Sequence, residues 1–366
     1  MLETTPAVFI AGNDYHIMVP IDCQCMTWVK VGEECFYDES NGILKSEVRI
    51  HRMIVPKELL DKEKRYTLCV RKIIERKPYF TQTEDVVEFP FDFCPSKGET
   101  IRAYHISDAH NMVEYPARAA KAYGDIDLLI MNGDLPEHCG NVENMISVYQ
   151  LAQEVTKGNI PIVFSRGNHD MRGVMAEKFA EYTPNVNGNT YYTFRTGNLW
   201  GMVLDCGEDK NDDSNEYGNT ICCHSFRKRQ TQFIKNVIKN AQSEYMAEGV
   251  KHKIVICHNP FTRKMNPPFD IEEEIYTQWA QLLRENVKPD LMLCGHTHKL
   301  SIDRIGCEND TYGQPCTVLI GAEPEIYDIA VSDKKSFKGA GLRFDNKGIE
   351  VTFTDCSGNT WGKEII

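Results

Sequence analysis

The chain of 366 residues lacks features that would each place it in a distinct class of protein. It has no apolar run near the roughly 18 residues that a membrane-spanning helix needs. Its first twenty residues contain neither a basic segment nor a continuous apolar one, so they do not resemble a secretory signal. Its 14 cysteines include no Cys-x-x-Cys pair. We therefore expect a cytoplasmic protein with reduced cysteines and no membrane partner.

An excess of basic residues is also missing. The chain has 41 Lys and Arg against 53 Asp and Glu, which gives a formal net charge of −12. Proteins that bind nucleic acids contact the phosphate backbone mainly through Lys and Arg, so this balance argues against a nucleic-acid partner. With 42% hydrophobic and 26% charged residues, the composition is that of a folded globular protein.

The pattern of apolar residues changes near residue 97 and predicts two domains. Residues 1–97 read as short strands separated by turn signals such as Asn41-Gly42, which predicts a small all-β sandwich of the immunoglobulin or fibronectin kind. Proline, serine and glycine mark a boundary within 94–98. In residues 98–366 strands alternate with helical stretches, which predicts an α/β layer fold.

Residues of metal-binding types follow five of the predicted strands in this second part. Because the carboxyl ends of strands line the ligand crevice of open α/β sheets, these side chains should converge although they are far apart in sequence. Each of these short motifs is weak evidence by itself, and the ordered set together indicates a metal site. Its members are Asp108 and His110, Asp134, Asn168 with His169 and Asp170, His258 with Asn259, and His296 with His298.

This ordered set resembles the calcineurin-like metallophosphoesterases. The motifs are Asp-x-His, Gly-Asp, Gly-Asn-His-Asp, a single His and Gly-His-x-His, and they span about residues 101–300. The resemblance implies a four-layer α/β/β/α sandwich with two metal ions at one edge. It assigns Asp108, His110 and His298 to one metal, Asn168, His258 and His296 to the other, and Asp134 to a bridge between them.

The resemblance also implies an activity. Imidazoles and hard oxygens suit two divalent or mixed-valence transition metal ions, namely Mn, Fe or Zn. The expected reaction is hydrolysis of a small phosphomonoester or phosphodiester by a metal-bound hydroxide. His169 would act as general acid with Asp170 orienting it. Arg166, Arg172 and His138 are the candidates for contacts with the substrate, because a guanidinium suits phosphate oxygens.

An N-terminal β domain before such a domain resembles the layout of purple acid phosphatases, with two departures. Those enzymes have a Tyr where Glu137 stands here, and they lack a His at the place of His110. A tyrosinate-bound ferric ion is therefore not expected. Two alternatives stay open: a nuclease of the same superfamily, and a binding module that carries an inactive phosphoesterase domain. We expect the acidic segment 208–219 to be a solvated loop near the site. The natural substrate, the metal pair and the oligomeric state are left open.

Overall fold

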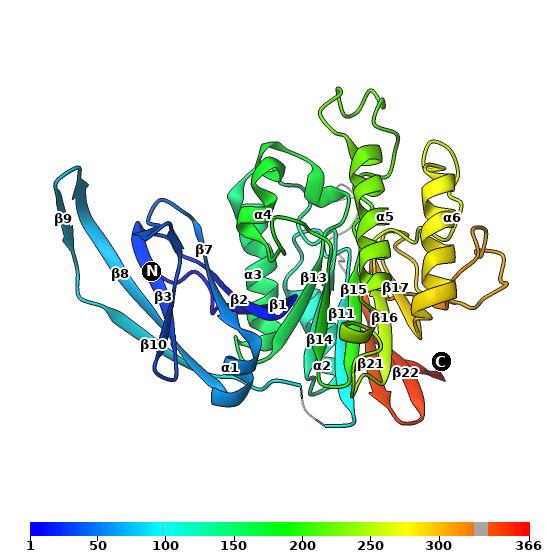
Figure 1. Cartoon of the computed structure of the whole chain (residues 1–366), viewed down its shortest axis with the longest axis horizontal. Helices are drawn as coiled ribbons and strands as arrows, with labels where there is room; N and C mark the ends of the chain where they lie inside the picture. The colour runs from blue at the N-terminus through cyan, green and yellow to red at the C-terminus, as the bar shows by residue number, and fades with distance from the viewer. Residues whose placement is uncertain (97, 326–335) are drawn as a thin grey trace.

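The computed structural model describes residues 1–96, 98–325 and 336–366, and it shows two central β-sheets flanked by helices (Figure 1). The larger sheet has ten strands. Along the sheet they are β23 (Thr360–Ile365), β22 (Gly348–Asp355), β21 (Ser336–Asp345), β11 (Ile101–Ile106), β12 (Leu128–Asn132), β13 (Pro161–Ser165), β1 (Ala7–Ala11), β2 (Asp14–Pro20) and β7 (Ile50–Pro56), with β20 (Ala322–Glu325) paired to β21.

The second central sheet has six strands. They are β14 (Tyr192–Thr196), β15 (Leu199–Val203), β16 (His252–Ile256), β17 (Leu291–Cys294), β19 (Thr317–Ile320) and β18 (Ser301–Asp303). Strands β15, β16, β17 and β19 are parallel, as are β11, β12 and β13 in the larger sheet. Parallel strands are covered on both faces, which explains why these segments are continuous apolar runs with every residue buried or nearly so.

Helices cover the outer face of each sheet, and three apolar cores separate the four layers. Helices α2 (Glu114–Tyr123) and α3 (Val142–Thr156) pack on the ten-stranded sheet, and α5 (Cys223–Lys239) and α6 (Glu273–Leu282) pack on the six-stranded one. The third core lies between the two sheets. The predicted α/β/β/α sandwich is therefore confirmed.

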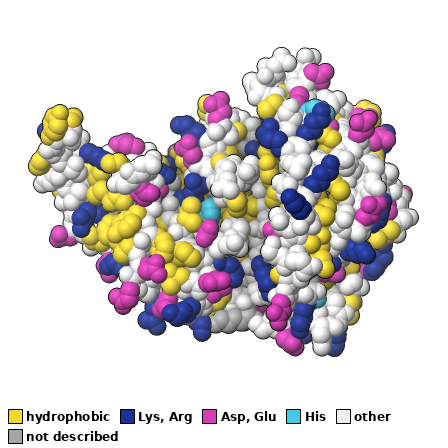
Figure 2. Space-filling model, viewed as in Figure 1, with side chains coloured by type: hydrophobic (Ala, Val, Ile, Leu, Met, Phe, Trp, Pro, Cys, Tyr) yellow, Lys and Arg dark blue, Asp and Glu magenta, His cyan; other side chains and the backbone are white. Residues whose placement is uncertain are grey.

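The N-terminal region contains an antiparallel sheet, as predicted, at the left of Figure 1. Its strands are β10 (Val87–Asp92), β8 (Arg65–Lys77), β3 (Cys25–Val31) and β4 (Glu34–Tyr37), with β9 (Phe80–Thr83) paired to β8. Figure 2 shows many apolar side chains on this part of the molecule. Exposed aromatic residues there include Tyr37, Tyr79 and Phe80.

Hydrogen bonding crosses the predicted boundary at residue 97. Strand β1 pairs in parallel with β13, with Val8 opposite Pro161, so the first strands of the chain extend the sheet that carries the site. The core between the two central sheets continues into the N-terminal sheet through residues such as Val29 and Leu68. The second layer of the predicted sandwich, opposite the N-terminal sheet, is thus the ten-stranded sheet. Division of the chain into independent units at residue 97 stays a prediction.

No helix in the described part of the chain combines the length and the apolar character needed to cross a membrane.

Substitution of Phe9 tests how strongly the N-terminal strands support the α/β layers. Phe9 is 1% exposed and makes edge-on contacts with Tyr149 of α3 and Phe164 of β13, each with ring centroids 6.0 Å apart. Phe9→Ala should lower the free energy of unfolding by about 3–5 kcal/mol, because it leaves a cavity in that core. Phe80→Ala, at a site that is 53% exposed, is the control and should change it by less than about 0.5 kcal/mol. Urea unfolding of both variants measures this, and equal effects would contradict the shared core.

Candidate metal centre

The candidate ligands lie together at one edge of the two sheets. Asp108 and His110 follow β11, Asp134 follows β12 and Asn168 follows β13, so these four come from the ten-stranded sheet. The other three candidate ligands, all histidines, come from the six-stranded sheet: His258 follows β16, and His296 and His298 follow β17. Six of these side chains form two groups, each with its nitrogen and oxygen atoms within 4.8 Å of one another, and Asn168 lies against His296 of the second group. The structure therefore brings together all seven predicted ligands.

The first group is Asp108, His110 and His298. Nε2 of His298 lies 3.2 Å from Oδ1 of Asp108 and 3.2 Å from Nε2 of His110. Asp108 is fully buried, and its Oδ2 accepts a hydrogen bond of 2.7 Å from Ser107 Oγ. One carboxylate oxygen and two imidazole nitrogens thus converge, which is a donor set that suits a transition metal ion.

The second group contains Asp134, His258 and His296, with Asn168 beside it. Nε2 of His258 lies 3.0 Å from Oδ2 of Asp134, and Nδ1 of His296 lies 3.0 Å from Oδ1 of Asn168. The two groups are neighbours, because the same His258 Nε2 is also 3.7 Å from Oδ1 of Asp108.

The environment of His258 shows that a cation fits between the groups. Its Nδ1 lies 2.8 Å from the carbonyl oxygen of Asn132, which can only accept, so Nδ1 carries a proton. Its Nε2 is buried without a hydrogen-bond partner among the described residues and faces the carboxylates of Asp108 and Asp134. A neutral imidazole would point a lone pair at two anions, so a positive charge has to lie there.

The pKa values of His258 and Asp134 also indicate that a positive charge is favoured between the two groups. Burial opposes a charge on His258, but Asp134 and Asp108 outweigh it and raise the pKa of His258 to about 10. Burial likewise disfavours the charged form of Asp134, but His258 outweighs it and holds the pKa of that carboxyl well below its usual range. A metal ion bound here would replace the His258 proton, since a ligating imidazole is neutral.

The ligand loops have an unusual backbone. Asp108, His110, Asp134, His296 and His298 all have positive φ, between 44° and 67°. The left-handed region costs a non-glycine residue roughly 1–2 kcal/mol, and such residues cluster at functional sites. Tight turns directly after the strands therefore aim these side chains at one point, at a cost in local stability.

Two motif glycines make room for ligands that belong to other motifs. A Cβ at Gly167 would lie 2.2 Å from Oδ1 of Asp134, and a Cβ at Gly295 would lie 2.4 Å from Oδ2 of Asp108. No side chain fits at either position without displacing a carboxylate. The glycines of Gly-Asn-His and Gly-His are thus spatial requirements of the cluster as well as turn formers.

His169 lies beside the cluster with both ring nitrogens engaged. Its Nδ1 is 2.8 Å from the carbonyl oxygen of Glu137, and its Nε2 is 3.0 Å from Nη1 of Arg172. Arg172 in turn donates two hydrogen bonds to the buried carboxylate of Glu208, of 3.1 and 3.2 Å. This pairing holds the guanidinium next to the His169 ring.

The predicted role of Asp170 is wrong. Because Glu137 and Arg172 occupy both nitrogens of the His169 ring, Asp170 does not orient it. Instead Asp170 is fully buried, and its Oδ2 accepts hydrogen bonds from the backbone N–H groups of Asp134 and Gly167. Burial, followed by the charge of Asp134, raises the pKa of Asp170 to about 8. Its carboxyl ties two ligand loops together.

The other predicted substrate contacts have different surroundings. Nε of Arg166 lies 2.7 Å from the buried Asp205, and its guanidinium stands over the ring of Phe226 at 5.2 Å. His138 is exposed, and its Nδ1 accepts a hydrogen bond from the backbone of Gly140. Contacts of Arg166 and His138 with a substrate stay predictions. Of the three candidates, Arg172 is the one that touches His169.

Two carboxylates at the site were not assigned a role from the sequence. Glu137 Oε2 lies 3.0 Å from His110 Nδ1, and Glu137, His110 and His169 form a third close group. The only feature of the sequence that points to Glu137 is its position three residues after Asp134. Glu208 belongs to the segment that was expected to be solvated, but it is 1% exposed. Its burial depends on Arg172, which comes from a different motif.

Four-layer sandwiches with Asp and His groups at one edge are the architecture of metal-dependent phosphoesterases. The sequence model of the calcineurin-like phosphoesterase family matches residues 101–300, which is more than half of the chain. The chain belongs to this family. None of the curated proteins compared with it gives a significant match.

Among solved structures, the chain is similar to purple acid phosphatase PPD1 from seeds of yellow lupin (Lupinus luteus). The match covers 98% of this chain and 72% of that one, with a TM-score of 0.56 and 13% identity. At this identity it shows the fold alone, including the N-terminal antiparallel sheet. A Vps29 single mutant from Entamoeba histolytica (TM-score 0.33, 11% identity) and TT1561 from Thermus thermophilus (0.39, 12%) cover 73% and 72% of this chain and 99% of their own.

Metal content tests the two groups. Asp134→Asn should carry fewer than two ions per chain after desalting, since it removes the negative charge nearest to His258. His298→Ala should keep about one ion, because it alters the first group only. Asp125→Asn, at an exposed loop position, is the control and should match the wild type. Elemental analysis reads out all three, and full two-ion occupancy in Asp134→Asn would contradict a bridging role.

Proposed function

We propose that the protein is a dinuclear metal-dependent phosphoesterase that hydrolyses a small phosphomonoester or phosphodiester. The observation that carries the proposal is the position of His258 Nε2, buried between the carboxylates of Asp108 and Asp134 where the two Asp and His groups meet. Membership of a phosphoesterase family gives the reaction class.

The donor set supports two transition metal ions such as Mn, Fe or Zn. Asp108, His110 and His298 would hold one, Asn168, His258 and His296 the other, and Asp134 would bridge them. When bound, a pair of such cations supplies activation of water and neutralisation of the phosphate charge. Ser107 and the carbonyl of Asn132 fix the ring of His258 for this task through its Nδ1.

His169 is the proposed general acid. Its Nδ1 is committed to the Glu137 carbonyl, so Nε2 is the nitrogen that would carry the proton for the leaving group. In the structure Nε2 accepts from Arg172, which is always a donor. Arg172 therefore has to turn from His169 to a phosphate oxygen when substrate binds, and its bidentate pairing with Glu208 keeps it within reach.

A small phosphoester, rather than a nucleic acid or a membrane lipid, is the proposed partner, and the proposed location is the cytoplasm. The net charge of −12 supports a small phosphoester over a nucleic acid. The test is a panel of phosphomonoesters and phosphodiesters, with single-stranded and duplex DNA, run with added Mn, Fe or Zn. Turnover of small esters above that of DNA is the expected result. Preferential cleavage of DNA would favour a nuclease, and no turnover by a chain with two bound ions would favour an inactive domain.

Replacement of His169 separates proton transfer from metal binding. General acid catalysis typically contributes about 10²–10⁴-fold, so His169→Ala should lower kcat on alkyl phosphates by that order. It should affect p-nitrophenyl phosphate much less, because nitrophenolate leaves without a proton. Both ions should be retained. Steady-state kinetics on the two esters is the measurement, and an equal loss on both would rule out the general-acid role.

A further inference from the structure

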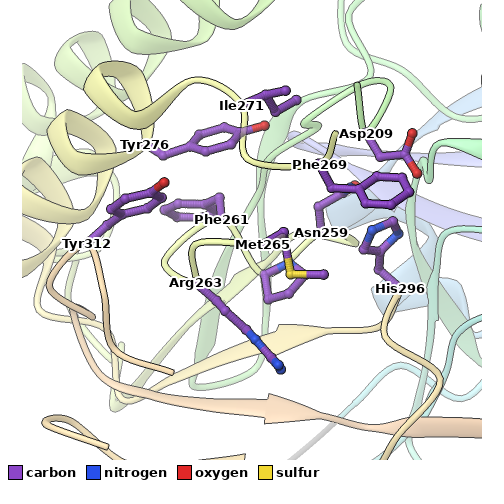
Figure 3. Close-up of a pocket in the computed structure, with 11 residues that line it drawn as sticks. Asp209, Asn259, Phe261, Arg263, Met265, Phe269, Ile271, Tyr276, His296 and Tyr312 are labelled. Atoms are coloured by element: carbon purple, nitrogen blue, oxygen red, sulfur yellow. The ribbon is translucent and has the colours of Figure 1, made fainter. Parts of the chain in front are cut away.

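A pocket opens directly beside the candidate ligand His296. Figure 3 shows His296, Asp209 and Phe269 near one end of it and Tyr312 and Phe261 at the other. The empty space among its lining residues measures about 360 Å³, including the part open to solvent. A space of this size lies at the lower end of the roughly 300–1,000 Å³ range of small-molecule pockets.

Two polar atoms that line this pocket are buried and unpaired. Oδ1 of Asn259 and the hydroxyl of Tyr312 have no hydrogen-bond partner among the described residues. Tyr312 is buried, with 8% of its surface exposed. Buried polar atoms are nearly always paired, and an unpaired one indicates a missing ligand or water. Both atoms can accept a hydrogen bond from such a ligand.

The remaining walls combine aromatic and apolar side chains with the charged side chains of Asp209 and Arg263. Phe269 is half-buried at the open end, and Nζ of Lys210 stands 5.3 Å from its ring centroid. Phe261 is held rigidly deeper in, with its ring 5.5 Å from that of Trp279 in an edge-on arrangement. Met265, also half-buried, supplies a flexible side chain that adapts to a bound ring.

We infer that this pocket receives the alcohol portion of the substrate, and that this portion is an aromatic ring carrying a hydrogen-bond donor. This inference rests on the proposed function, since it places the scissile ester at the metal centre and the ring against Phe269. A flat ring suits the pocket because it stacks on Phe269. Its donor group satisfies the unpaired acceptor of Asn259 or of Tyr312. A plain alkyl alcohol would leave Asn259 and Tyr312 unpaired.

The first test compares 2-naphthyl phosphate with phenyl phosphate, whose leaving groups have similar acidity. The wild type should prefer the naphthyl ester in kcat/KM, and Phe269→Ala should reduce this preference about fivefold, in line with the loss of an aromatic contact. Phe80→Ala, an exposed phenylalanine on β9, is the matched control and should keep it. An unchanged preference in Phe269→Ala with normal thermal unfolding would overturn the proposal.

A second test does not depend on turnover. Calorimetry with the full chain should show that 2-naphthol binds, that 2,6-dihydroxynaphthalene binds about threefold more tightly through its second hydroxyl, and that Tyr312→Phe removes this gain. If naphthol binds through Phe269 but no ester is hydrolysed, the pocket stands and the proposed function fails. The opposite case is that esters are hydrolysed while 2-naphthol binds neither the wild type nor Phe269→Ala, or binds both equally well. Either result would mean that the pocket holds only water, and the inference fails.

Discussion

The structure of the site depends on the electrostatic demand of two buried carboxylates, Asp108 and Asp134, that face the same imidazole edge of His258. Such an arrangement is unfavourable without a positive charge between the groups. Glycine at 167 and 295 lets the loops come close enough to create it, and left-handed backbone at five ligands aims the side chains inward. Binding of cations would offset both the local backbone strain and the electrostatic repulsion between the carboxylates.

The two sheets have different tasks in this arrangement. The ten-stranded sheet supplies both carboxylates, Asn168 and His110, while the six-stranded sheet supplies the other three histidines. The site therefore forms only when the sheets pack on each other through their common core. Because β1 extends the larger sheet next to β13, the N-terminal strands help to hold that core although they contribute no ligand.

Much of the site could be predicted from the sequence because ligands that directly follow parallel strands must meet at one sheet edge. That rule needs only local patterns, and the seven candidate ligands do lie together at one edge. The choice of these seven among the residues that follow the strands came from the family resemblance. The pairing of β1 with β13 could not be predicted, because Val8 and its neighbours form an apolar run that fits any buried strand. Glu208 is buried because it pairs with Arg172, and Asp170 lies away from the His169 ring because it bonds to the backbone of Asp134 and Gly167. Spacing in the sequence does not reveal which partner a carboxylate binds.

The most direct test of the account is a crystal structure of the protein soaked with Mn²⁺, with anomalous scattering used to locate the ions. The account predicts two peaks, one among Asp108, His110 and His298 and one among Asn168, His258 and His296, with Asp134 in contact with both. A single peak, or ions bound elsewhere while His258 keeps its proton between the carboxylates, would contradict it.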